Sequence, residues 1–503
     1  MTALSDMIEA GRRIQAHRPW PRVAVDDETW RLAADRVAEG TWTLLGLWGE
    51  RSAVHMALFD ERATVVAVLS LECPQGRFPS VGRVHPPAIR LERAIRDLWG
   101  LDGEGAVDAR PWLDHGRWGL RHPLGTGGAA PPTPTPYSFL PTEGEGLHRI
   151  PVGPVHAGII EPGHFRFTAN GETVVRLEER LGYVHKGIEQ LMTGAPLAEA
   201  ARLAGHVSGD STVAYALAFA RAVEAALDIE ALPRAVWLRA LMAELERLAN
   251  HFGDIGAICN DASFTLMHAH CGILRERVLR AADAAFGHRL MMDRIVPGGL
   301  AVDLRAEGIA AILALVAEVR RLFPRLTELY DNTASLQDRT AGTGIVKPEL
   351  VRQFGCGGYV GRAAGRAFDA RRTPGYPPYP SLRFEVPVLA AGDVDARVWI
   401  RIREVEQSLL VIEQLLGQLP SGPVRVPVDA AGAGEGLALV EGFRGDVFVW
   451  VRVAADGTVA RCHLRDPSWF QWPLLEAAIE GNIVADFPLC NKSFNCSYSG
   501  HDL

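Results

Sequence analysis

Apolar residues fill three successive short runs near the start of the chain, which predicts an antiparallel sheet. The runs are residues 41–49, 53–60 and 63–72, and short polar turns separate them. One helix is predicted before the runs, at residues 28–39, and a second follows them at residues 86–100. Together these elements predict a complete α/β unit.

A helical spacing of apolar residues dominates the rest of the chain. Within residues 236–255, apolar side chains recur every three or four positions. A second, polar row runs beside them: Glu244, Arg247, His251 and Asp254. It lies about 100° around the same helix, so we expect it at the edge of the core. Residues 397–418 repeat the apolar spacing and predict another helix, and residues 445–465 predict a β-hairpin.

A segment rich in Gly, Pro and Thr separates the two patterns. Residues 124–146 read LGTGGAAPPTPTPYSFLPTEGEG, a composition typical of linkers. The sequence therefore predicts an α+β multidomain protein. Its parts are an N-terminal α/β domain (residues 1–123), this linker, and a mainly α-helical bundle with small β elements (residues 147–503).

Composition and charge exclude several classes of protein. The chain has 503 residues and a net charge of −8, which argues against a nucleic-acid binder. No run of about 18 apolar residues predicts a membrane span, and the first residues lack the apolar core of a signal peptide. We expect a cytoplasmic protein.

The seven cysteines form no CxxC pair, and an odd, sparse set is a poor disulfide framework. Cys490 and Cys496, with His501 nearby, leave a small metal site open as an alternative to buried structural thiols.

Longer strings indicate a family. ERAIRDLWG and DARPWLDHGRW resemble the 30 kDa-type subunit of the peripheral arm of respiratory complex I. From about residue 150, the chain resembles the 49 kDa-type, quinone-site subunit of complex I and the large subunit of nickel–iron hydrogenases. The matching strings include GPVHAGIIEPGHFRF, RLGYVHKGIEQL, ERLANHFGDIGA, FDARRTPGYPPY and DPSWFQW. Fusion of the two modules is typical of group-4 hydrogenases of the formate-hydrogenlyase type.

The hydrogenase resemblance implies a nickel–iron centre held by four thiolates from two CxxC pairs, because deprotonated sulfur stabilises these metals. The first pair falls on Ala204 and Val207, and the second falls on Ser468 and Gln471. None of these residues offers a thiolate. We therefore expect no nickel–iron site and no metal bound by this chain.

The complex I resemblance implies a quinone site with a histidine, an aspartate and a tyrosine at the headgroup. His164 and Asp254 fall at the first two positions, and the tyrosine position lands near Gly205. A carboxylate beside an imidazole raises the imidazole pKa and keeps a proton ready for a reduced quinone oxygen. His164 and Asp254 are thus expected to form a catalytic, proton-donating pair.

Two further matches concern charged side chains. Glu189 matches a glutamate that relays protons in hydrogenases, and Lys186 replaces an arginine of the same string. Lys186, with Asp369 and Arg371 of a charged loop that lines the cavity in relatives, is a candidate for cofactor binding. Taken alone, Lys186 and Glu189 also fit a solvated i,i+3 pair, and Arg371 also fits a surface turn.

The resemblance implies a subunit of a membrane-associated, complex-I-like redox complex, peripheral to the inner (cell) membrane, that couples electron transfer to proton translocation. It implies partners that carry the iron–sulfur clusters: a small iron–sulfur subunit, a ferredoxin-like subunit and the membrane-arm subunits. Quinone and NAD binding belong to the same family chemistry. The alternative is a catalytically degenerate scaffold that bridges the iron–sulfur and membrane subunits.

Overall fold

A computed structural model describes residues 3–129, 136–156, 160–428 and 432–503 of the chain. Its elements up to residue 104 are α1 (Leu4–Ala10), β1 (Arg12–Arg13), β2 (His17–Arg18), β3 (Arg22–Val25), α2 (Asp27–Ala38), β4 (Thr43–Glu50), β5 (Ala53–Asp60), β6 (Val65–Glu72), β7 (Arg77–Pro79), α3 (Ile89–Trp99) and β8 (Asp102–Glu104). The three predicted strands and both predicted helices are confirmed.

The N-terminal elements form a five-stranded sheet with the order β1-β3-β6-β5-β4. β4, β5 and β6 are the predicted antiparallel meander, and β3 joins β6 in parallel. The central six residues of each meander strand are buried, so both faces of this sheet are covered. This burial explains why the sequence shows near-continuous apolar runs there.

The remaining elements confirm the α+β class. They are β9 (Leu147–Val152), β10 (His164–Asn170), β11 (Thr173–Arg180), α4 (Ile188–Met192), α5 (Leu197–Gly205), α6 (Thr212–Leu227), α7 (Pro233–Asp261), α8 (Thr265–Phe286), β12 (Ile295–Val296), β13 (Gly299–Leu300), α9 (Ala306–Asp331), α10 (Ala334–Thr340), α11 (Pro348–Gln353), α12 (Gly358–Ala363), α13 (Val394–Gly417), β14 (Gly434–Glu441), β15 (Asp446–Val453), β16 (Val459–Arg465), α14 (Ser468–Ala478), α15 (Phe487–Phe494) and α16 (Tyr498–Asp502).

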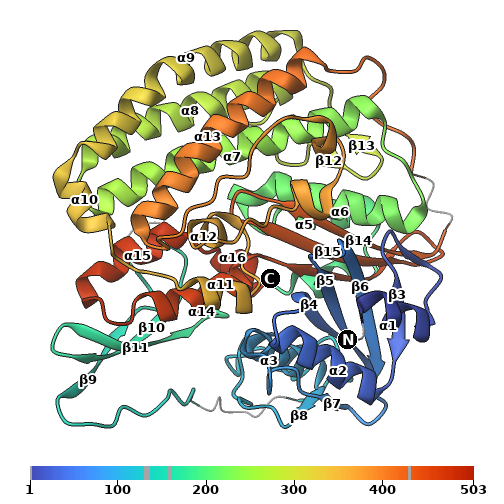
Figure 1. The fold of residues 1–503 in the computed structure, drawn as a ribbon. Helices are drawn as coiled ribbons and strands as arrows, with labels where there is room; N and C mark the ends of the chain where they lie inside the picture. Colours follow the sequence, from blue (N-terminus) through green and yellow to red (C-terminus); the bar gives the residue numbers. More distant parts are fainter. Residues whose placement is uncertain (1–2, 130–135, 157–159, 429–431) are drawn as a thin grey trace.

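Four long helices, α7, α8, α9 and α13, pack side by side as a bundle at one end of the molecule (Figure 1). The predicted helices are α7 and α13. The apolar row of α7, from Leu238 to Ile255, is fully buried. Among the described residues, every helix is too short or too polar to cross a bilayer.

A second sheet links the two ends of the sequence. Its order is β16-β15-β14-β2, and β15 with β16 forms the predicted hairpin. β2, from the N-terminal part, pairs in parallel with β14. Trp48 of β4 stacks on His463 of β16 with ring centroids 5.1 Å apart. The two predicted domains thus pack on a shared core, and the boundary at residues 124–146, of which 130–135 lie outside the described residues, stays a prediction.

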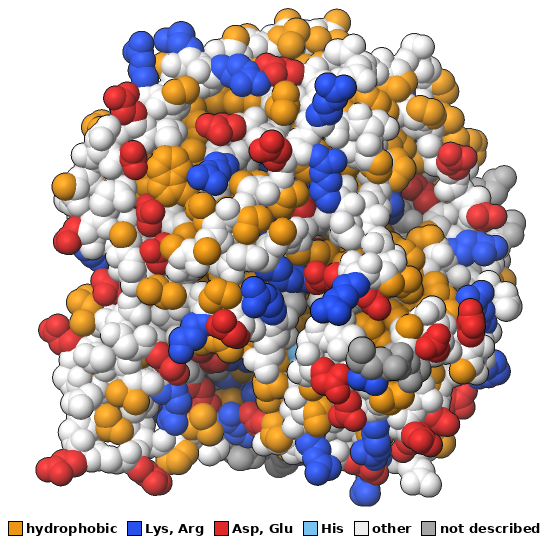
Figure 2. All heavy atoms as spheres, in the orientation of Figure 1, with side chains coloured by type: hydrophobic (Ala, Val, Ile, Leu, Met, Phe, Trp, Pro, Cys, Tyr) orange, Lys and Arg blue, Asp and Glu red, His pale blue; other side chains and the backbone are white. Residues whose placement is uncertain are grey.

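A third sheet, β11-β10-β9, carries the segment that contains His164. In Figure 1 this sheet and the helices α2 and α3 lie on opposite sides of a gap between the ribbons. Acidic, basic and apolar side chains are interspersed on the face drawn in Figure 2, which is hollowed in its lower half between these two regions.

Candidate functional site

Glu189 is buried in the first turn of α4 rather than paired with Lys186 in solvent. Its carboxylate accepts a hydrogen bond from His463 Nδ1 at 2.7 Å and pairs with Arg461 at 2.8 Å. Burial alone would raise its pKa, but Arg461 and His463 outweigh burial and hold the pKa at about 2. Glu189 is therefore ionised at neutral pH, and it ties α4 to β16. The solvated i,i+3 interpretation is wrong.

Lys186 lies just before Gly187, a residue in the left-handed region at the N-cap of α4. Its Nζ donates a hydrogen bond to the backbone oxygen of Val207, 3.2 Å away. Partial burial lowers the Lys186 pKa. This contact brings the cofactor candidate Lys186 to Val207, a position that the hydrogenase resemblance assigns to a nickel thiolate.

His164 is the first residue of β10 and is largely buried. Its Nδ1 lies 3.2 Å from the oxygen of Gly153, and Arg166 Nε donates to its Nε2 at 3.4 Å. These partners fit a neutral ring with the proton on Nδ1, because a carbonyl can only accept and an arginine can only donate. Burial lowers the His164 pKa, which favours the same neutral form.

Asp254 is held on α7 by two other partners. Its Oδ2 accepts from Arg401 Nε at 3.0 Å, and its Oδ1 accepts from Asn495 Nδ2 at 2.8 Å. His164 and Asp254, both in the part of the chain that the structure describes, share no direct hydrogen bond. The structure does not join the predicted pair by direct contact, and their catalytic roles stay predictions.

The polar row of α7 is buried, not placed at the core's edge as expected. Glu244 and His251 are 0% exposed, Arg247 is 1% exposed, and Asp254 is 7% exposed. The sequence prediction was wrong because it considered one helix alone. α13 covers this face with polar groups of its own: His251 bonds to Glu404 at 2.7 Å, and Ser408 donates to Glu244 at 2.7 Å.

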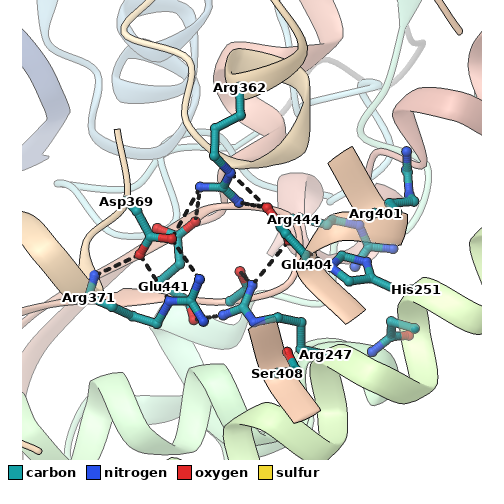
Figure 3. Close-up of polar contacts among 12 residues, drawn as sticks. Arg247, His251, Arg362, Asp369, Arg371, Arg401, Glu404, Ser408, Glu441 and Arg444 are labelled. Carbon is teal, nitrogen blue, oxygen red and sulfur yellow. Dashed lines mark hydrogen bonds and ion pairs between the residues drawn. The ribbon is translucent and has the colours of Figure 1, made fainter. Parts of the chain in front are cut away.

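Arg362 of α12 occupies the centre of this buried network (Figure 3). Its Nε donates to Glu404 at 2.7 Å, and its Nη1 donates to Glu441 of β14 at 2.9 Å. Asp369 lies 3.5 Å from the same Nη1. One guanidinium therefore joins α13, β14 and the loop after α12, which suits the planar five-donor geometry of arginine.

Asp369 and Arg371 belong to the same network and not to a surface turn. Arg371 binds both oxygens of Asp369, at 3.0 and 2.7 Å, and donates to Glu244 at 2.9 Å. Burial opposes ionisation of Asp369, but Arg371 and Arg362 outweigh burial and lower its pKa. Burial, with Asp369 nearby, raises the pKa of Glu441. Both candidates are engaged by internal partners.

All four positions that the hydrogenase resemblance assigns to nickel ligands are buried: Ala204, Val207, Ser468 and Gln471. Ser468 Oγ accepts a hydrogen bond from the backbone nitrogen of Ser497 at 2.8 Å. Gln471 Nε2 donates to the backbone oxygen of Arg444 at 2.7 Å. The polar side chains at these positions thus bind neighbouring loops of the chain.

Residues 497–503, here called the C-terminal segment, pack against the same region. Asp502 accepts from the backbone nitrogens of Gly182 and Val184, at 2.9 and 3.0 Å, and its own backbone oxygen lies 2.7 Å from His185 Nδ1. Apart from the metal-site alternative at His501, the sequence indicates no role for this segment, because nothing local in it signals a contact with residues more than 300 positions earlier.

The cysteines give no metal centre in the part of the chain that the structure describes. All seven are buried and free. No group of three or more His, Cys, Asp or Glu side chains with the geometry of a metal site occurs among residues 3–129, 136–156, 160–428 and 432–503. Cys496 contacts Gln471 at 3.9 Å, and Cys490 is fully buried.

Sequence reasoning missed Arg362, Arg401, Glu404 and Glu441. Arg401 and Glu404 lie inside residues 392–408, GDVDARVWIRIREVEQS, but their contacts involve partners more than 40 residues away. The sequence does contain one signal for Arg401 and Glu404. They are charged residues at helical spacing within the mainly apolar helix α13, and a charge on a buried face requires a partner.

Comparisons with known proteins agree with this architecture. Residues 261–432 match the family model described as the respiratory-chain NADH dehydrogenase 49 Kd subunit. The chain is 30% identical over 469 residues to formate hydrogenlyase subunit 5 of Escherichia coli (strain K12), which covers 90% of this chain and 82% of that protein. It is 25% identical over 465 residues to the C/D protein of the NADH-quinone oxidoreductase of Phocaeicola vulgatus, covering 87% of this chain and 90% of that protein.

A solved structure shares the fold. One chain of the membrane-bound sulfane sulfur reductase, an archaeal respiratory membrane complex, superposes with a TM-score of 0.67. The sequence identity is 26%, over 71% of this chain and 99% of that chain.

Proposed function

Because the chain belongs to the family of 49 kDa-type NADH dehydrogenase subunits and group-4 hydrogenase large subunits, we propose that it serves a membrane-bound redox complex without a nickel–iron centre. It is a complex-I-like subunit in which the 30 kDa-type and 49 kDa-type modules are fused, in line with the match along most of the Phocaeicola vulgatus relative. In this proposal it lies at the membrane surface and receives electrons from clusters in its partners.

The observation that carries this proposal is the absence of any two cysteines separated by two residues. A nickel–iron centre of this family needs two such pairs, since thiolates stabilise both metals. Ala204 and Val207, at the positions of the first pair, are buried and offer no lone pair. In this proposal the chain keeps the fold of a hydrogenase large subunit but not its nickel chemistry.

In the active form of the proposal, this chain forms the cavity in which an acceptor such as a quinone is reduced, or in which that reduction is coupled to proton translocation. His164 and Asp254 remain its proton-donating candidates. Its partners are a small iron–sulfur subunit, a ferredoxin-like subunit and membrane-arm subunits. The name of the structural relative, a sulfane sulfur reductase, supports chemistry other than hydrogen evolution on this fold.

A second candidate is a scaffold that bridges iron–sulfur and membrane subunits. The observation in its favour is that Asp254 is already bound by Arg401 and Asn495, and Glu189 is bound by Arg461 and His463. Buried carboxylates need partners, and here the chain itself supplies them, so no substrate is required to explain these residues.

Affinity purification of the tagged full chain from mildly solubilised membranes tests the assembly. We expect an iron–sulfur protein and membrane subunits to copurify in fixed ratio, because the relatives belong to multisubunit membrane complexes. Recovery of a stable, monodisperse chain with no companion subunit would contradict the proposal under both the active and the scaffold form.

A further inference from the structure

A cavity of about 360 Å³ lies where the N-terminal part of the chain meets the C-terminal part. α3 and β4 line one side, and residues 185–191, β16 and the C-terminal segment line the other. Apolar side chains predominate in the lining: Leu91, Ile95, Leu98, Trp99, Leu191 and Trp469. The volume falls within the range of about 300–1,000 Å³ that small-molecule sites occupy.

The cavity is open to solvent along part of its lining, where Leu120 is 41% and Leu191 is 56% exposed. Apolar surface gathered in one recess favours a ligand, because its removal from water is favourable. Here the indoles of Trp48, Trp99, Trp118 and Trp469 contribute rigid walls. An apolar ligand body would cover this surface at little conformational cost to the walls.

The acidic groups at the cavity are already engaged. Glu189 is bound by Arg461 and His463. Asp502 accepts hydrogen bonds from two backbone nitrogens and from His501 Nδ1 at 2.8 Å. They therefore offer little to a cationic ligand.

Lys186 differs from these carboxylates. Its ammonium group donates one hydrogen bond, to the Val207 oxygen, and it forms no ion pair with any of the described residues. The carboxylates whose charge acts on the Lys186 ammonium are those of Glu161 and Asp502. Both accept hydrogen bonds from backbone nitrogens. Because an ammonium has three donors, two remain for a ligand.

A larger polar cavity of about 950 Å³ adjoins the apolar one, and Trp118 and His185 line both. The lining of the polar cavity includes Arg96, Arg117, Arg121 and Arg180 beside Asp97, Asp102 and Asp114. Asp102 pairs with Arg96 at 2.9 Å, and Asp97 accepts hydrogen bonds from backbone nitrogens. The excess of positive side chains favours anions over cations near the opening. An anion that enters through the polar cavity meets Lys186 at the edge of the apolar one.

The geometry points to a binding site for a small amphiphilic anion, whose apolar body fills the cavity and whose carboxylate or phosphate head binds Lys186. The site uses Lys186, one of the cofactor candidates, but neither His164 nor Asp254 lines it. Its ligand is of a different kind from a quinone, and its test does not need a redox activity. It joins the two fused modules, so an occupant would contact both.

Lysine acetylation of the full chain in its purified complex tests the site directly. The chain has three lysines, Lys186, Lys347 and Lys492, so mass spectrometry resolves each one. Laurate at about ten times its Kd should slow acetylation of Lys186 about tenfold, because about one site in eleven then stays free. Acetylation of Lys347, which is exposed on the surface, should not change.

Three further probes separate the chemistry and the source of the ligand. Dodecanol keeps the apolar body without the charge and should protect Lys186 less than laurate does. Protection by free laurate or dodecyl phosphate indicates a soluble acid. Protection only by vesicles that contain phosphatidylglycerol indicates a membrane lipid. If none of these probes protects Lys186, the proposal is overturned.

Variants test the two halves of the site through tryptophan fluorescence titration with laurate. Lys186→Met should weaken laurate binding by about tenfold or more, since a charge-assisted hydrogen bond is lost, and the matched Lys347→Met should leave it unchanged. Ala94→Phe, on the cavity side of α3, should block binding. Equal laurate affinity in wild type and Lys186→Met overturns the proposal, and this comparison decides the matter even if Ala94→Phe does not fold.

Discussion

Arg401 Nε donates a hydrogen bond to Asp254 Oδ2 across 3.0 Å, and this pair ties α13 to α7 inside the bundle. Arg401 is fully buried and also donates to the backbone oxygens of Arg397 and Ser493. Asp254 is thus the only carboxylate in hydrogen-bond contact with this guanidinium among the described residues. Asp254, a candidate proton donor, therefore also holds two helices together, and mutation can separate these two roles.

Asp254→Asn keeps the shape of the side chain and removes its charge. We expect the free energy of unfolding to fall by about 1–3 kcal/mol, because Arg401 keeps an acceptor but loses its counter-charge. If Asp254 also donates protons, turnover of the assembled complex should fall far more than the loss of folded protein explains. Unchanged turnover with intact assembly would leave the scaffold as the better account. Glu276→Gln, in an exposed ion pair of α8, is the control.

Much of the fold follows from the apolar pattern. The meander, α3, α7, α13 and the β15–β16 hairpin each have a period or turn signal that needs no distant partner. The pairing of β2 with β14 has no such local signal, because β2 is only two residues long and its partner lies more than 400 positions later. No local pattern encodes such a contact.

The candidate site was less predictable than the fold. A single helix shows that Glu244 and His251 share a face, but it does not show what covers that face. The covering groups, Ser408 and Glu404, come from α13, more than 150 residues later. Burial of a charged row depends on these partners, so its position could not be derived from α7 alone.

Glu441 should make stability depend on pH. Its pKa is raised above the ordinary value of 4.5 by burial and by Asp369. Above about pH 5 the unfolded state has lost this proton while the folded state still holds it, so the free energy of unfolding falls as pH rises. Glu441→Gln imitates the protonated form and should flatten this part of the curve.

Glu404→Gln is the matched control for that experiment, because Arg362 and His251 outweigh burial and lower the Glu404 pKa. Glu404 is ionised in both states above about pH 5, so this variant should lose stability by a similar amount throughout. Chemical denaturation at about pH 5.5 and about pH 8 measures both variants. The same slope in wild type and Glu441→Gln would contradict the assignment.

Glu189→Gln should destabilise the fold by about 3–5 kcal/mol at neutral pH, because it leaves Arg461 buried without its counter-charge. The Glu189 pKa is held at about 2, below the ordinary value of 4.5. Its contribution is therefore present above about pH 4.5 and is lost as pH falls toward about 2. The gap between wild type and variant should narrow in acid. Glu199→Gln, exposed on α5, should change little at any pH.

Limited proteolysis should cut first within residues 124–146, where Pro and Gly leave little backbone to protect. The two fragments should nevertheless elute together in size-exclusion chromatography. Trp48 stacks on His463, and Glu50 pairs with Arg452 at 2.7 Å, so the packing across the boundary survives the cut. A first cut inside residues 150–420, or fragments that separate without denaturant, would be evidence against the boundary or the shared core.

The nickel content of the intact complex tests the central claim most directly. Elemental analysis of the complex, purified through a tag on this chain without chelators, should give iron from the partner subunits and no stoichiometric nickel. The reason is that no CxxC pair exists to supply the thiolates. A value of about one nickel atom per chain, with hydrogen-dependent dye reduction, would contradict the account.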